Sequence, residues 1–109
     1  MVVVKRSGDR EPFDRTKIVA GLRAAAKSRP FDDEALELVA SDVEERLRLD
    51  VGAELTTEQI GLAVLDRLRD LDHVAYVRFA SVYKGFDDAT DFARELTLLT
   101  KDTAPKAHS

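Results

Sequence analysis

VVVKRSGDREPFDRTKI (Val2–Ile18) joins a β-branched run to a polar turn and a short second run that ends at Phe13. This pattern predicts a hairpin of two antiparallel strands, with Gly8 adopting the positive φ that the turn requires. Pro12 restricts the second strand to an edge position or to its last residue, because proline has no N–H group to donate. Asp14 follows as the predicted N-cap of a helix. The chain is therefore expected to open with a hairpin that leads directly into a helix.

Four helices are predicted because apolar residues recur along the chain at intervals of three and four. Asp14 and Asp72 are the expected N-caps of the first and fourth helices, and Thr56 with Gln59 forms a capping box for the third. The second helix is expected to open at Asp32, with the acidic Asp33 and Glu34 in its first turn. The faces expected to be buried in the first two helices are Ile18, Leu22 and Ala25, then Leu36, Val39, Val43 and Leu47. The third helix is expected to bury Ile60, Val64, Leu68 and Leu71. The fourth helix is expected to bury Ala75, Phe79, Val82 and Phe86.

The segments between the helices complete the fold prediction. Residues 50–55 contain Gly52, which breaks the helical pattern, and leave room for a short third strand beside the hairpin. Gly85 is expected to bend or end the fourth helix, and residues 87–99 either continue it or form a short fifth helix. The predicted class is α+β, with a small β-hairpin or three-stranded sheet capping a bundle of about four helices.

Length and composition indicate one globular domain. The 109 residues are 44% hydrophobic and 35% charged, and no apolar run approaches the ~20 residues that cross a bilayer. We expect a domain over residues 1–99 and a flexible tail over residues 100–109, which contain little to bury. The opening MVVVK lacks the features of a signal peptide, so a cytoplasmic protein without membrane contact is expected.

Several kinds of site are disfavoured by residue content. The chain has no cysteine, and His73 and His108 lie too far apart in the sequence to suggest a metal site. Neither histidine accompanies a serine or carboxylate in a recognisable catalytic motif, so no enzyme is predicted. The sequence also lacks the phosphate loops GxxxxGK and GxGxxG. A net charge of -4 argues against a broad basic face for nucleic acid.

Positive charge nevertheless gathers around the predicted turn and helix start, at Lys5, Arg6, Arg15 and Lys17. Cations in the first turn of a helix oppose its macrodipole, at a cost of up to ~1 kcal/mol each, unless an anion binds there. The free backbone N–H groups of that turn are anion donors, so a phosphate would meet both kinds of partner. Alternatively, these cations are solvated and balanced by Asp9, Glu11 and Asp14. Charge alone leaves both interpretations open.

Glu11, Thr56 and two tyrosines are candidates either for a ligand site or for ordinary structural roles. Glu11 would repel phosphate but can accept a hydrogen bond from an amino group or a ribose hydroxyl, and a salt bridge is its common alternative. Thr56 is a helix cap that can also offer a polar contact. Tyr76 and Tyr83, seven residues apart, are either core residues or rings presented to a ligand or a partner subunit.

Two separated stretches resemble one family. VVKRSGDREPFDRTKI (residues 3–18) closely resembles the opening of the ATP-cone, a regulatory domain found on ribonucleotide reductases and on the repressor of their genes. LDHVAYVRFASVYKGFDDATDF (residues 71–92) resembles the repressor branch, called NrdR, more than the enzyme-attached cones. Two motifs in the right order make the match specific, and the resemblance covers nearly the whole chain.

The resemblance implies a domain that binds ATP or dATP, with Mg²⁺, and changes its oligomeric state according to the nucleotide. By motif position it assigns these residues to the pocket: Val4, Lys5, Arg6, Glu11, Lys17, Thr56, Tyr83 and Lys84. The basic residues near the hairpin are implied at the phosphates, Glu11 at the nucleoside and Val4 at the adenine. The implied function is that of an allosteric domain of a transcriptional repressor of ribonucleotide reductase genes, which distinguishes ATP from dATP through the 2′-hydroxyl.

The sequence departs from the repressor pattern in one respect. Repressors of this family carry an N-terminal zinc ribbon with four cysteines that contacts DNA, and this chain has no cysteine. DNA contact is therefore expected only through a zinc ribbon outside this chain. The chain itself is expected to be either part of a longer repressor or a freestanding cone that acts through a partner. Two alternatives stay open, namely the N-terminal cone of a ribonucleotide reductase and a helical protein-interaction module without nucleotide.

A homo-oligomer is expected, and the fourth helix is the element expected to respond to the nucleotide. Tyr83 would face the ligand, while Tyr76 and Phe79 would be available for packing or for a partner.

Overall fold

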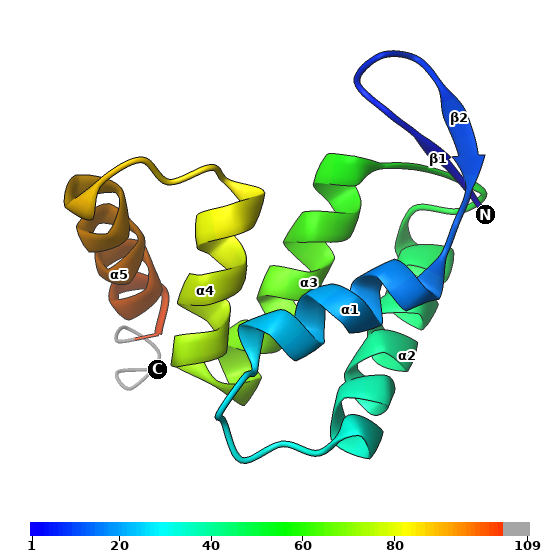
Figure 1. Cartoon of the computed structure of the whole chain (residues 1–109). Helices are drawn as coiled ribbons and strands as arrows, with labels where there is room; N and C mark the ends of the chain where they lie inside the picture. The colour runs from blue at the N-terminus through cyan, green and yellow to red at the C-terminus, as the bar shows by residue number, and fades with distance from the viewer. Residues whose placement is uncertain (104–109) are drawn as a thin grey trace.

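The computed structural model describes residues 1–103, with the side chains of residues 1–100. Over this part of the chain a small sheet lies at one end of a group of helices (Figure 1). The strands are β1 (Val2–Val4), β2 (Arg10–Pro12) and β3 (Glu54–Thr56). The helices are α1 (Arg15–Ala25), α2 (Asp33–Asp50), α3 (Thr57–Leu71), α4 (His73–Tyr83) and α5 (Ala89–Thr103). The predicted α+β class is confirmed.

The sheet has the order β2-β1-β3, with β1 antiparallel to β2 and parallel to β3. Val3 on the central strand is buried, as is its partner Leu55 on β3, so this face of the sheet closes the end of the core. The hairpin turn is held by the N–H of Gly8, which donates to the carbonyl of Lys5 at 2.8 Å. Gly8 has φ +91°, as the turn chemistry predicted. The third strand, predicted from residues 50–55, is also confirmed.

Each predicted helix start is confirmed by a capping hydrogen bond. The carboxylates of Asp14, Asp32 and Asp72 accept from backbone N–H groups in the first turns of α1, α2 and α4. Thr56 and Gln59 form the complete capping box of α3. The predicted faces of α1 and α2 are buried throughout, and α3 buries Val64 and Leu68. These stripes meet in one core because each helix can cover its apolar face only against the others.

The predicted face of α4 is partly wrong. Val82, which was expected inside, has 84% of its surface exposed. Tyr76, which was expected on another face and available for packing or for a partner, packs in the core with only 3% exposed. α4 packs against α1 and α3 on one side and α5 on another, so its inward arc is wider than one stripe. Tyr83, four residues after Phe79, continues this arc, whereas Val82 falls one residue short and faces solvent.

The chain after α4 turns sharply. Gly85 has φ +65° and ends α4, and residues 89–103 form a separate fifth helix that lies against α4 (Figure 1). α5 extends to Thr103, into the segment 100–109 that was predicted to be a flexible tail. Residues 104–109, including His108, lie outside the described residues. Between residues 1 and 103 the structure contains no helix long and apolar enough to span a bilayer.

Candidate functional site

A cavity of about 200 Å³ lies where the sheet, the start of α1 and α3 meet. Its apolar walls come from Val3, Phe13, Ile18, Ile60, Val64 and Phe79. Its polar lining comes from Glu11, Asp14, Lys17 and Thr57. Sites that enclose a whole drug-sized molecule usually measure about 300–1,000 Å³. This cavity can therefore hold an aromatic ring, while the rest of a larger ligand would lie at its mouth.

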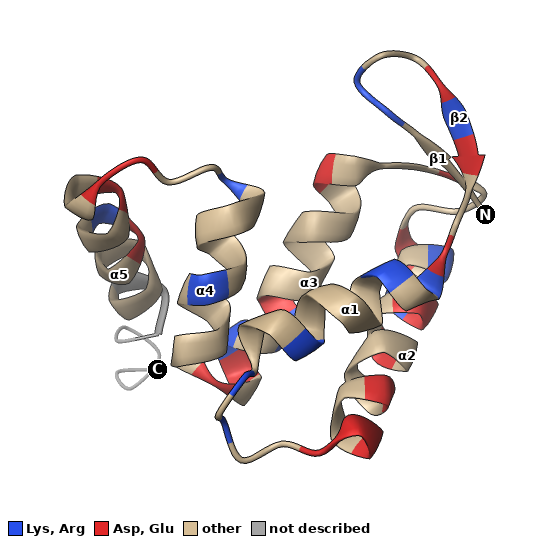
Figure 2. Ribbon diagram, viewed as in Figure 1, with Lys and Arg blue, Asp and Glu red and all other residues tan. Residues whose placement is uncertain are grey.

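Glu11 bridges two lysines at the mouth of this cavity. Its Oε2 lies 3.2 Å from Nζ of Lys5, and its Oε1 lies 3.3 Å from Nζ of Lys17. The hydrogen bond from Lys5, assisted by Lys17, holds the pKa of the Glu11 carboxyl below its usual value. Figure 2 shows the resulting mixture of basic and acidic residues on the hairpin and at the start of α1. Two cations from separate elements thus converge on one carboxylate.

Arg6 lies at the hairpin tip and reaches a different helix start. Its Nε donates to Oε1 of Glu58, in the first turn of α3, at 2.9 Å. This bond keeps the pKa of the Glu58 carboxyl low. β1 ends at Val4, so Lys5 and Arg6 belong to the turn, where the strict alternation of strand side chains no longer applies. The turn therefore directs Lys5 toward Glu11 and Arg6 toward Glu58.

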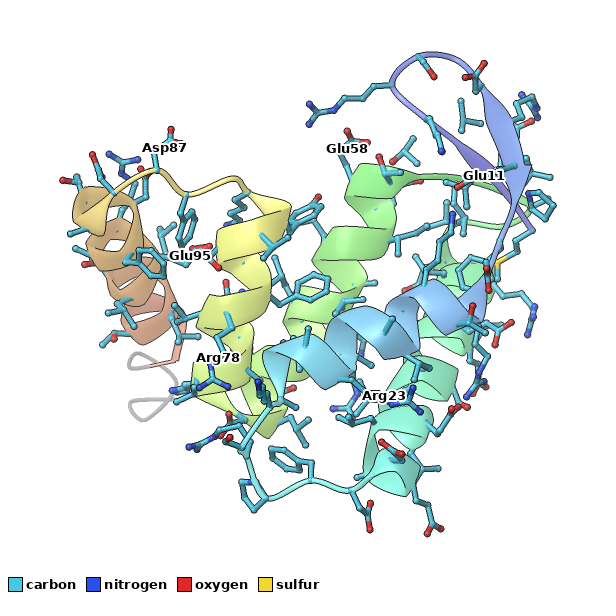
Figure 3. All side chains as sticks on the ribbon, viewed as in Figure 1. Glu11, Arg23, Glu58, Arg78, Asp87 and Glu95 are labelled. Carbon is cyan, nitrogen blue, oxygen red and sulfur yellow. The ribbon has the colours of Figure 1, made fainter. Side chains whose placement is uncertain are left out.

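Glu58 is also the point at which α4 joins α3. The hydroxyl of Tyr83 donates to the carbonyl oxygen of Glu58 at 2.9 Å, and burial raises the pKa of this phenol. In Figure 3, Glu58 stands at the start of α3, beneath the hairpin tip, and Glu11 lies between β2 and α1. The hairpin tip, the start of α3 and the end of α4 therefore meet around one residue.

Val4 and Thr56 are paired across β1 and β3, which places both beside the start of α3. Thr56 is engaged as a cap, because its hydroxyl accepts from the N–H of Gln59 at 3.1 Å. Neither Val4 nor Thr56 lines the cavity; the neighbouring Thr57, which the sequence did not single out, does. Ile60 was predicted only as a core residue and Phe79 as a core residue or a partner contact, but both also line the cavity. No local sequence signal separates a core side chain from one that lines a cavity.

Two predicted cations lie away from the cavity. Arg15 pairs with Glu37 of α2 at 2.6 Å, so it fastens α1 to α2. Lys84 at the end of α4 lies 2.5 Å from Oε1 of Glu95 on α5. The structure thus brings Lys5, Glu11 and Lys17 together and places Lys84 elsewhere.

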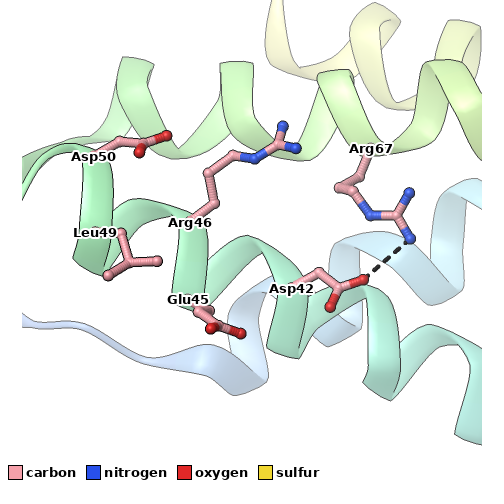
Figure 4. Close-up of a pocket in the computed structure, with 6 residues that line it drawn as sticks. All are labelled: Asp42, Glu45, Arg46, Leu49, Asp50 and Arg67. Atoms are coloured by element: carbon pink, nitrogen blue, oxygen red, sulfur yellow. Dashed lines mark hydrogen bonds and ion pairs between the residues drawn. The ribbon is translucent and has the colours of Figure 1, made fainter.

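A second hollow, of about 470 Å³, lies between α2 and α3 (Figure 4). It is lined by Asp42, Glu45, Arg46, Leu49, Asp50 and Arg67. Arg67 is already paired with Asp42 at 3.2 Å, and three carboxylates face the same space. This hollow offers neither an apolar wall for a ring nor a net positive field for an anion, so it is not a candidate nucleotide site.

Comparison with known proteins supplies the family. The family described as ATP cone domain matches residues 1–89. A protein named Transcriptional repressor NrdR from Salinispora arenicola (strain CNS-205) is 54% identical over 99 residues, which cover 91% of this chain and 64% of that protein. A protein of the same name from Mycobacterium tuberculosis (strain ATCC 25177 / H37Ra) is 49% identical over 109 residues, which cover all of this chain and 71% of that protein. The chain therefore spans about two thirds of these relatives, and it belongs to the ATP cone domain family, within the NrdR repressors.

Proposed function

We propose that this chain is the nucleotide-sensing domain of a transcriptional repressor of ribonucleotide reductase genes, and that it binds ATP or dATP. The observation that carries the proposal is the convergence of Lys5 and Lys17 on Glu11, at the mouth of an apolar cavity. A polyphosphate would find two ammonium groups already directed at one point, and a purine ring would find apolar walls beside them. The family and the relatives' names support this assignment.

The phosphates would replace Glu11 as the partner of Lys5 and Lys17. The freed Glu11 carboxylate would then need new donors, which the amino group of adenine or the hydroxyls of ribose supply. This exchange accounts for an acidic residue inside a phosphate-binding cluster. It also makes the nucleoside and the polyphosphate depend on each other, because neither part alone satisfies all three side chains.

The other proposed contacts surround this exchange. Arg6 would leave Glu58 for a phosphate, and Val4 would contact adenine through its backbone and side chain. Thr56 and Tyr83 would bound the pocket at the start of α3. Mg²⁺ would be carried by the phosphates, because no group of three or more potential ligands occurs among the described residues.

Nucleotide-dependent self-association is the proposed output, and DNA contact is assigned to a zinc ribbon outside this cysteine-free chain. Tyr76 is buried in the core, which was one of the two roles expected from the sequence, so it is not available to a partner. Apolar side chains that are available on α4 and α5 are Val74, Val82, Phe92, Leu96 and Leu98. A repressor with this output would act in the cytoplasm.

Calorimetric titration with ATP and dATP tests the proposal directly. We expect a dissociation constant on the order of micromolar for at least one nucleotide. Gel filtration with each nucleotide should then give different elution volumes. No heat and no thermal shift at millimolar nucleotide would instead favour a helical protein-interaction module.

A further inference from the structure

α5 is an addition to the cone. The family match ends at residue 89, where α5 begins, and α5 packs mainly against α4 (Figure 1). The contact includes the rings of Phe86 and Phe92, which meet edge to face with their centroids 4.9 Å apart. Leu99 is buried on the same side of the helix. A helix attached mainly through one neighbour can open while the other helices stay packed.

The contact between α4 and α5 contains an unusual charge. Among the side chains of residues 1–100, Glu95 is the only charged one that is buried, with 3% of its surface exposed. Its ion-pair partner is Lys84, 2.5 Å away at the end of α4. Figure 3 shows Glu95 between the two helices. A buried carboxylate is tolerated only while it is paired, so the docking of α5 depends on Lys84.

We propose that nucleotide binding undocks α5 by taking Lys84 away from Glu95. This inference rests on the proposed function and adds to it Lys84, which the family resemblance assigns to the pocket and which pairs with Glu95 in this structure. Lys84 directly follows Tyr83, whose hydroxyl is held by Glu58, and Glu58 also holds Arg6. A phosphate chain drawn to Arg6 therefore lies at the end of the molecule where Lys84 is anchored. Once Lys84 turns to the phosphate, Glu95 is left buried without a cation.

Undocking gives the domain an output that depends on the ligand. The carboxylate of Glu95 regains water, and the apolar surface that α5 shared with α4 becomes available, including Phe86 and Leu99. α5 thus acts as an arm that reports whether the site is filled.

Hydrogen–deuterium exchange of the whole chain with and without 5 mM ATP tests this proposal. ATP should slow exchange in residues 1–17, which shows that the site is filled, and speed exchange in residues 89–103 at least roughly tenfold. Protection of residues 1–17 with unchanged exchange in residues 89–103 would overturn the inference while leaving the nucleotide site intact. No protection of residues 1–17 would overturn both.

Three variants sharpen the test. Glu95→Gln removes the charge that needs Lys84, so α5 should stay docked when ATP binds, whereas an unchanged ATP response would overturn the inference. Lys84→Met should leave α5 exchanging fast with or without ATP, and exchange as slow as in the original chain would equally overturn it. Arg94→Met is the matched control, because Arg94 pairs with Asp91 within α5, and it should respond to ATP like the original chain.

Discussion

The ring of Tyr83 lies across Gly61 of α3, at a distance that leaves no room for a side chain. A Cβ atom on Gly61 would stand 2.0 Å from Cε1 of the tyrosine ring. Because this glycine lets α4 approach α3 so closely, the Tyr83 hydroxyl can reach the carbonyl of Glu58 at 2.9 Å. The absence of a side chain at Gly61 therefore allows the corner of the candidate site at which Arg6 and Tyr83 both contact Glu58.

Gly61→Ala should destabilise the protein by about 1–3 kcal/mol, because the new methyl group must push the Tyr83 ring aside. In an ordinary exposed helix the same change stabilises by up to about 1 kcal/mol, so the sign itself is informative. Urea unfolding followed by circular dichroism measures the difference. Gly21→Ala is the matched control, because its Cβ would lie 3.3 Å from a ring atom of Phe79 and needs only a small adjustment.

A double-mutant cycle separates the clash from other effects of the alanine. Tyr83→Ala removes the ring, so adding Gly61→Ala in that background should cost much less than it does alone. Full additivity, or a more stable Gly61→Ala single variant, would show that the helices do not need this close approach.

Lys17→Ala should weaken ATP binding at least roughly tenfold, because it removes one of the cations proposed to hold the phosphates. Its effect on the free energy of unfolding should stay within about 0.5 kcal/mol, since the side chain is 65% exposed. Calorimetry measures the dissociation constant and urea unfolding measures the free energy of unfolding. Lys27→Ala is the control, because it removes one positive charge from the surface away from the cavity. Parallel losses of binding and stability would make Lys17 a structural residue.

The elements of this fold could be predicted where the information is local. Asp14 caps α1 through the N–H of Thr16, and Thr56 caps α3 through Gln59, and both contacts lie within three residues. The face of α4 could not be predicted in the same way, because three other helices decide which of its residues are covered. Periodicity alone placed Val82 inside, whereas the position of α5 and α3 around α4 brings Tyr83 inward instead.

In the candidate site, too, local features could be predicted from the sequence and contacts between distant segments could not. The gathering of Lys5 and Lys17 near a helix start was expected from charge and from the macrodipole. Contacts between distant segments were beyond that argument: Arg6 meets Glu58, which lies 52 residues later, and Lys84 meets a residue on the next helix. Such pairs follow only from how α3, α4 and α5 are placed.

Glu11→Gln should change what the site selects. Without the carboxylate, Lys5 and Lys17 are no longer occupied, so inorganic tripolyphosphate should bind roughly threefold to tenfold more tightly. ATP should gain less or lose affinity, because the amide is a poorer acceptor for the nucleoside, and the preference for ATP over tripolyphosphate should therefore shrink. Calorimetry with both ligands measures this ratio.

Asp9→Asn is the control for Glu11→Gln, because it removes the same charge from the same hairpin without touching either lysine. It should leave the ratio of the two affinities unchanged. If Asp9→Asn shifts the ratio as far as Glu11→Gln does, only net charge matters and the exchange of partners at Glu11 is refuted.

Stability should fall in acid because several carboxylates have lowered pKa values in the folded state. These are Glu11, Asp14, Glu58 and Asp72. Near pH 4 the unfolded chain binds more protons than the folded chain, so the free energy of unfolding rises with pH there. We expect it to be nearly level from pH 7 to about pH 5 and to drop as the pH falls below about 4.5. Urea unfolding at several pH values checks this.

Asp72 offers the clearest single contribution to that pH dependence. Arg29 contacts both carboxylate oxygens of Asp72, at 2.8 and 3.0 Å, and is the main reason for the lowered pKa of Asp72. The side chain of Asp72 is only 12% exposed. Asp72→Asn keeps a helix cap but loses the charge, so it should be less stable at pH 7 and lose less stability on acidification. Asp42→Asn, an exposed partner of Arg67, is the control and should follow the original chain. If the free energy of unfolding of Asp72→Asn falls with acid as steeply as that of the original chain, the ionised Asp72–Arg29 pair does not stabilise the fold.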